Sequence, residues 1–138
     1  MNIHTRTVGD VHILDISGKI VLGQGTMVVR STIKDLLHNG VKNIVLNLAE
    51  VGYIDSSGVG ELVSSYTTVA KEGGQLKLLN LTNKVQEILA ITRLLTVFQV
   101  YENEQAAVSA AFDGNRPAPH LLELRATARA GEAQNKPE

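Results

Sequence analysis

The residues with the clearest chemical potential in this chain are two adjacent serines, Ser56 and Ser57, which stand between Asp55 and Gly58. A short apolar run ends just before them, and a helical spacing of apolar residues begins just after them, at Val59. Asp and Ser oxygens accept hydrogen bonds from the unpaired N–H groups of a first helical turn. The pattern therefore predicts two hydroxyls at a strand-to-helix junction, on the positive end of a helix dipole.

The simplest interpretation of such a serine is a helix N-cap with no further role. The glycines Gly58 and Gly60 favour a second interpretation, because a first turn without side chains lets a partner approach the backbone closely. A serine in this position suits a protein kinase. The kinase supplies ATP, Mg²⁺ and a base, and needs from its substrate only an exposed hydroxyl in a defined position.

Other chemistries have less support from the sequence. The Gly-x-Ser-x-Gly pattern is absent, and no histidine is placed beside Ser56 for a catalytic triad. There is no cysteine, and the four histidines include no i, i+4 pair, so we expect no metal site. The Gly-Gln-Gly run at 23–25 lacks the further Gly and the Lys of a phosphate-binding loop and is interpreted as a flexible turn. We expect no enzyme activity and no cofactor, although an anion site at the helix N-terminus stays physically possible.

Composition limits the function classes further. A length of 138 residues predicts one domain, and 43% hydrophobic with 4% aromatic residues predicts a core of Val, Ile and Leu. A net charge of -1 argues against direct nucleic-acid binding, which needs a concentrated basic face. The N-terminus has no apolar signal core, and no apolar stretch is long enough to span a membrane. We expect no membrane association and a cytoplasmic location.

Hydrophobic periodicity predicts the elements that position the serines. Gly18 is expected to end the second strand. Helix caps are expected at Thr26, at Thr82 or Asn83, and at Asn103. Glu61 is expected to be a solvated carboxylate in a first helical turn. Strands are expected at 3–7, 11–17, 43–48, 75–80 and 97–101, and helices at 26–38, from the serine motif to Gly73, from about 83, and at 104–112. Alternation of these elements predicts an α/β fold: a mixed, mostly parallel sheet of four to five strands with about four helices and an N-terminal hairpin.

The motif Asp55-Ser56-Ser57-Gly58-Val59-Gly60 resembles the Asp-Ser-Ser/Thr-Gly-Leu-Gly signature of STAS domains, specifically the bacterial anti-sigma factor antagonists. The resemblance extends to Asn43–Leu48 before the motif, to Gly73-Gly74 after it, and to Phe98 and Tyr101 followed by an Ala-rich helix. It covers about residues 1–112 as a STAS domain, and leaves 113–138 as a linker and tail.

The resemblance implies a STAS fold, a phosphoacceptor at Ser56, and a partner that is both an anti-sigma factor and a Ser/Thr kinase of the ATPase fold. The unphosphorylated protein would bind this partner and free a sigma factor, phosphorylation would end binding, and a Ser-phosphatase would reset the switch. An alternative is a structural STAS subunit of a stress-signalling or lipid-transport assembly without a sigma-pathway role. The partner-binding residues implied are Asp55, Ser56, Ser57, Gly58, Val59, Gly60 and Glu61.

One position departs from the family pattern. Many members carry Asp after a Gly-x-Leu/Ile segment, and in Gly18-Lys19-Ile20-Val21 that slot holds Val21. The resemblance then implies a kinase more divergent than those of the best-known sporulation and stress pathways.

Residues 113–138 are expected to form a mobile tail, rather than a short helix at 121–130, because few apolar residues are present to anchor a helix. Truncation after Asn115 should therefore move the thermal unfolding midpoint by no more than a few degrees, as measured by circular dichroism. A large drop in the midpoint would mean that Leu121, Leu122 and Leu124 pack on the domain.

Overall fold

Five strands form one mixed sheet in the computed structural model, which describes residues 1–112. The strand order is β1-β2-β3-β4-β5, in which β1 and β2 are antiparallel and all other neighbours are parallel. The strands are β1 Asn2–Val8, β2 Val11–Ile20, β3 Asn43–Ile54, β4 Gln75–Leu79 and β5 Val100–Tyr101. The helices are α1 Gln24–His38, α2 Ser56–Lys71, α3 Asn83–Ile91 and α4 Glu104–Phe112. The predicted fold class is confirmed, hairpin included.

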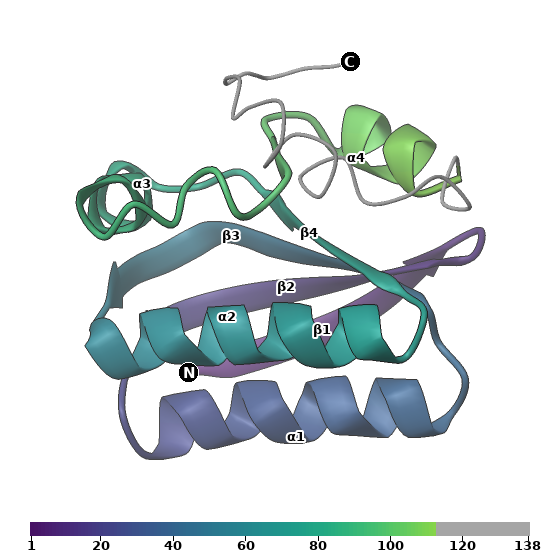
Figure 1. Cartoon of the computed structure of the whole chain (residues 1–138), viewed down its shortest axis with the longest axis horizontal. Helices are drawn as coiled ribbons and strands as arrows, with labels where there is room; N and C mark the ends of the chain where they lie inside the picture. The colour runs from purple at the N-terminus through teal and green to yellow at the C-terminus, as the bar shows by residue number, and fades with distance from the viewer. Residues whose placement is uncertain (113–138) are drawn as a thin grey trace.

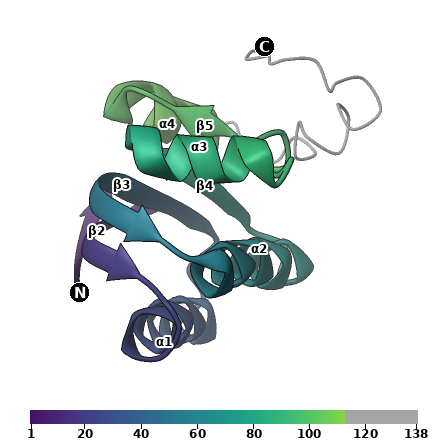
Figure 2. The ribbon, with the colours of Figure 1, turned by 90° about the vertical axis from the view of Figure 1, so that its left-hand side faces the viewer.

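Helices cover both faces of the sheet. Figures 1 and 2 show α1 and α2 on one face and α3 and α4 on the other. The main core cluster is aliphatic except for Phe98, as the composition predicts, and α1 contributes Val29 and Ile33 to it. No helix within residues 1–112 has the length and apolar character needed to cross a bilayer. The tail predicted at 113–138 lies outside the described residues.

The two central strands are longer than predicted. β2 does not end at Gly18 but continues to Ile20, because Gly18 adopts a φ of 108° at an irregularity where the β2–β3 register shifts. The segment 49–52, expected to be a connection, belongs to β3 and pairs with the extended end of β2. These extensions carry both strands to the point where the serine motif begins.

Two boundary predictions are wrong for local reasons. α1 begins at Gln24 after Gly23, and Thr26 does not cap it, because its hydroxyl lies inside the helix and donates to the Gly23 carbonyl at 3.1 Å. The last strand is two residues long instead of 97–101, since a turn holds the chain before it through a bond from Val97 N to Leu94 O. The predicted caps at Thr82 and Asn103 are confirmed: each accepts a backbone N–H of its helix.

An ion-paired arginine fastens α4 to the N-terminal hairpin. Arg6 donates to Asp15 at 2.6 Å and to Glu104, the first residue of α4, at 2.7 Å. Asn47 on β3 also donates to Asp15, at 2.7 Å. Hydrogen bonds from Arg6 lower the pKa of both carboxyl groups below their usual values. Arg6 thus joins elements 98 residues apart in the chain.

Arg6→Met should reduce stability at neutral pH by about 1 kcal/mol or less, because the three side chains are about a third exposed and solvent screens the pairs. Since the folded-state pKa values of Asp15 and Glu104 are lowered, the pairing contributes fully above about pH 5. It is lost as the pH falls through those lowered values, below about pH 4. Urea unfolding across this pH range should therefore show that the free energies of unfolding of Arg6→Met and of the original chain become equal in acid. Lys34→Met, at an exposed position of α1, is the control. A difference in unfolding free energy between Arg6→Met and the original chain that stays constant with pH would contradict the stabilising role of the Arg6 ion pairs.

Candidate functional site

Asp55 is the residue around which the candidate site is built. It is the N-cap of α2, and its Oδ1 accepts from Gly58 N at 2.8 Å. Its Oδ2 accepts from Leu22 N, in the β2–α1 loop, at 3.1 Å. Its own N–H donates to Ile20 O, at the end of β2, at 3.4 Å. One residue therefore holds β2, the loop after it and the start of α2 in a fixed relation.

Asp55 accepts hydrogen bonds from two N–H groups at the start of α2. Gly58 N donates to the carboxylate, and Val59 N donates to the Asp55 main-chain carbonyl at 2.9 Å. The bonds from Gly58 and then Leu22 lower the pKa of the Asp55 carboxyl, which stays ionised at neutral pH. The protein's own aspartate thus places an anion at this helix terminus.

Ser56 and Ser57 are the first two residues of α2, and they differ in exposure. Ser56 is exposed and Ser57 is half-buried. Neither hydroxyl makes a hydrogen bond to any residue in the range 1–112. The cap itself is Asp55, which leaves both serines free of the capping role that was their simplest interpretation. Ser56 is the hydroxyl that an enzyme reaches more easily.

The two glycines of the motif have different structural roles. A Cβ on Gly58 would lie 2.0 Å from Ile20 O and 2.6 Å from a side-chain carbon of Ile54. The absence of a side chain at Gly58 is therefore a packing requirement, which lets α2 lie against the end of β2. A Cβ on Gly60 would meet nothing within 4 Å. Gly60 lies exposed on the helix, and no internal contact requires it to be glycine.

Glu61 is not the solvated carboxylate that was expected. It is 4% exposed and accepts from Arg30 Nη2 of α1 at 2.8 Å and from Ser65 at 3.3 Å. Its position in the second turn of α2 directs it toward the neighbouring helix, where Arg30 compensates the buried charge. Glu61 therefore ties α1 to α2, and its carboxylate is directed into the protein. Val59 is likewise buried, at 5% exposure, and supports the site from beneath.

Three exposed apolar side chains accompany this junction, and the sequence reasoning missed them. Leu22 is 74% exposed, Met27 64% and Tyr53 42%. Leu22 is hydrogen-bonded through its backbone to Asp55, and Tyr53 lies two residues before it on β3. Met27 lies in the first turn of α1, whose start is at the same end of the molecule (Figure 2). The sequence did indicate the exposure of Met27, because this residue lies off the apolar helix face that Val29 and Ile33 define.

Comparison with known proteins gives a consistent result. The STAS domain family matches residues 2–107. The anti-sigma-B factor antagonist of Bacillus subtilis is 30% identical over 95 residues, which is 69% of this chain and 85% of that protein. The anti-sigma F factor antagonist of Paenibacillus polymyxa is 25% identical over 99 residues, 72% of this chain and 85% of that protein.

A solved structure shows the same fold. The crystal structure of an anti-sigma factor antagonist from Mycobacterium paratuberculosis superposes with a TM-score of 0.70. It covers 81% of this chain and 94% of its own, at 19% sequence identity. At that identity the likeness concerns the arrangement of strands and helices alone.

The contrast between the two glycines predicts opposite effects on stability. Gly58→Ala should lower the free energy of unfolding by about 3 kcal/mol, because the new methyl group forces α2 away from β2. Gly60→Ala should leave it unchanged or raise it by up to about 1 kcal/mol, because alanine favours a helix and nothing obstructs it. Urea unfolding of the two variants measures both. Equal losses of stability in the two would contradict the distinction.

Proposed function

This chain belongs to the STAS domain family, and from that premise we propose that it is a phosphorylation-switched binding protein of the anti-sigma factor antagonist kind. In its unphosphorylated form it binds an anti-sigma factor that is also a Ser/Thr kinase of the ATPase fold, and so frees a sigma factor. Phosphorylation of Ser56 ends this binding, and a Ser-phosphatase restores it. The protein acts in the cytoplasm, performs no catalysis of its own, uses no cofactor and contacts neither nucleic acid nor membrane directly.

The exposure of Ser56 beside an open helix surface supports this proposal most directly. Ser56 and Gly60 are four residues apart and therefore share one face of α2, where both are exposed. Leu22, Met27 and Tyr53 add apolar area on neighbouring elements. Apolar side chains around a flat, glycine-containing helix face provide the kind of surface that a protein partner covers. Of the motif residues, Ser56, Ser57 and Gly60 would contact the partner, while Asp55, Gly58, Val59 and Glu61 position them.

A phosphoryl group on Ser56 would stand next to the Asp55 carboxylate at the start of α2. Asp55 already accepts from Gly58 N, and its carboxylate repels the added charge of about -1.5 to -2. The Arg30 guanidinium is paired with Glu61. The phosphoryl group therefore projects toward the partner, and burying it without a cation there costs about 3–5 kcal/mol. That is about two to nearly four decades of affinity, which is enough for a switch.

A structural STAS subunit of a larger assembly is the second candidate, and the apolar surface around Ser56 would suit it equally well. The two functions differ in whether phosphate on Ser56 controls binding. In a structural subunit Ser56 is not an acceptor, and an acidic residue there has no specific effect. The valine at position 21, where many family members have aspartate, favours this candidate or a divergent kinase.

Incubation with candidate Ser/Thr kinases of the ATPase fold and radiolabelled ATP, followed by site mapping, tests the proposal. Ser56→Ala should abolish phosphorylation and remain bound to the kinase, and it should cost little stability because Asp55 supplies the cap. Ser57→Ala should keep the acceptor. Ser56→Asp should bind the kinase more weakly, although one carboxylate reproduces phosphate only in part.

A bulky neutral side chain at position 60 provides an independent readout. A Cβ at position 60 meets no atom of the folded protein within 4 Å. Gly60→Gln should therefore unfold at the same or a higher urea concentration than the original chain, yet it should weaken kinase binding at least tenfold. Gln105→Glu, at an exposed position of α4, is a control that should change neither the urea midpoint nor the affinity for the kinase. Phosphorylation that persists in Ser56→Ala and disappears in Ser57→Ala would overturn the assignment of the acceptor. Absence of labelling with unimpaired binding by Ser56→Asp would instead favour the structural subunit.

A further inference from the structure

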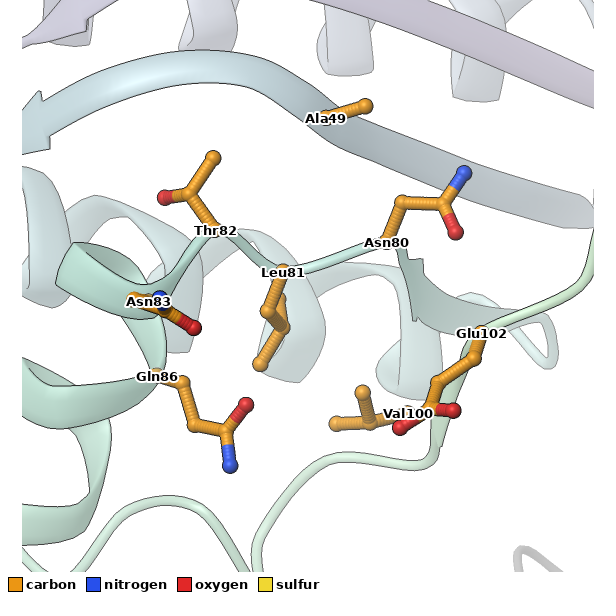
Figure 3. Close-up of a pocket in the computed structure, with 8 residues that line it drawn as sticks. All are labelled: Ala49, Asn80, Leu81, Thr82, Asn83, Gln86, Val100 and Glu102. Atoms are coloured by element: carbon orange, nitrogen blue, oxygen red, sulfur yellow. The ribbon is translucent and has the colours of Figure 1, made fainter.

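A second site candidate lies on the opposite side of the sheet from α1 and α2. A hollow of about 370 Å³ is formed where β4 and β5 end and α3 begins (Figure 3). Asn80 directly follows β4 and Glu102 directly follows β5, so two neighbouring parallel strands deliver polar side chains to one place. At about 30 Å³ for each water molecule, the hollow holds about a dozen waters or a small organic molecule.

Some of the lining residues are committed to the structure. Thr82 donates to Val51 O at 2.9 Å and accepts from Val85 N at 3.3 Å, so its hydroxyl proton and one of its two lone pairs are used. Asn80 has a φ of 57°, and its backbone N–H donates to Tyr101 O at 2.8 Å. These contacts fix the β4–α3 connection and hence the shape of the wall.

Other lining residues have unused hydrogen-bonding capacity. The side chains of Asn83, Gln86 and Glu102 make no hydrogen bond or ion pair with the rest of residues 1–112. Figure 3 shows Gln86 on the α3 side and Glu102 on the β5 side, with the side chains of Leu81 and Val100 between them. The hollow thus has a carboxamide wall, a carboxylate wall and an apolar floor.

The charge of this lining selects the class of ligand. Glu102 is the one ionisable residue among the described lining residues, and none of them is Lys, Arg or His. An anionic ligand would meet a carboxylate and no cation. One ammonium group would pair with Glu102, and a second would donate to the carboxamide oxygens of Asn83 and Gln86 on the other wall. The methylene segment between the two ammonium groups would lie on Leu81 and Val100.

We propose that the hollow between α3 and β5 binds a small aliphatic amine, whose ammonium group is held by Glu102 and whose carbon chain lies on Leu81 and Val100. This site is distinct from the Ser56 surface and does not depend on phosphorylation. The ligand is a free small molecule of the size of a diamine or an amino acid.

Titration of the full chain with 1,5-diaminopentane, followed by amide chemical shifts in NMR, tests the proposal. Saturable shifts should appear at Leu81, Gln86 and Val100 with a Kd of about 1 mM or tighter. The uncharged analogue 1,5-pentanediol should cause none at the same concentrations. Glu102→Gln keeps the shape, breaks no hydrogen bond or ion pair within residues 1–112 and should weaken diamine binding at least about tenfold.

Glu87→Gln is the matched control, because Glu87 lies exposed on α3 next to Gln86 without lining the hollow. Its affinity for the diamine should equal that of the original chain. Three results would overturn the proposal: no saturable shifts, equal shifts with the diol, or equal weakening by Glu87→Gln and Glu102→Gln. The last would show a general attraction of a cation to an acidic surface.

Discussion

The arrangement at the functional end of this protein depends on the two oxygens of Asp55. One accepts from the first turn of α2, and the other accepts from Leu22 in the loop before α1. The carboxyl ends of β2 and β3 pair with each other as far as Ile20 and Ile54, whose side chains are buried, and Asp55 links this paired end to the helix start. The contact of Gly58 with Ile20 completes the junction, since a side chain there would separate the two elements. Ser56 owes its defined position to this junction, although it takes no part in it.

Different residues of the motif therefore hold Ser56 in position and keep the helix surface around it exposed. Asp55, Gly58 and Val59 face the protein, and Ser56 and Gly60 face solvent. A motif that only capped a helix would need the first group and would gain helix stability from any side chain in place of Gly60. Glycine at position 60, an unobstructed helical position, lowers the stability of the helix by about 1 kcal/mol relative to alanine. Close approach of a partner to the helix is a physical reason for that cost, and it agrees with the exposed apolar side chains nearby.

The sequence predicted those features that depend on local pattern, and missed those that depend on contacts between distant residues. Apolar periodicity predicted the α/β fold, and capping chemistry predicted Thr82 and Asn103. The burial of Glu61 was missed because it depends on Arg30, which is 31 residues away on another helix. The continuation of β2 past Gly18 was missed because glycine usually weakens a strand, and here it forms an irregularity inside one. The different roles of Gly58 and Gly60 could not be predicted, because both residues look alike until the position of Ile20 is known.

The identity of the cap also bears on how a phosphoryl group on Ser56 would act. A neutral cap would leave the positive end of the helix to attract the phosphoryl group inward, where N–H groups could neutralise it. The Asp55 carboxylate accepts from one of those groups, Gly58 N, and adds a like charge next to Ser56. The phosphoryl group is then more stable pointing away from the helix, into the space that a partner would occupy. Under the proposed function, the interaction that positions the serine also keeps the added charge on the surface, so a change in partner affinity needs no rearrangement of the fold.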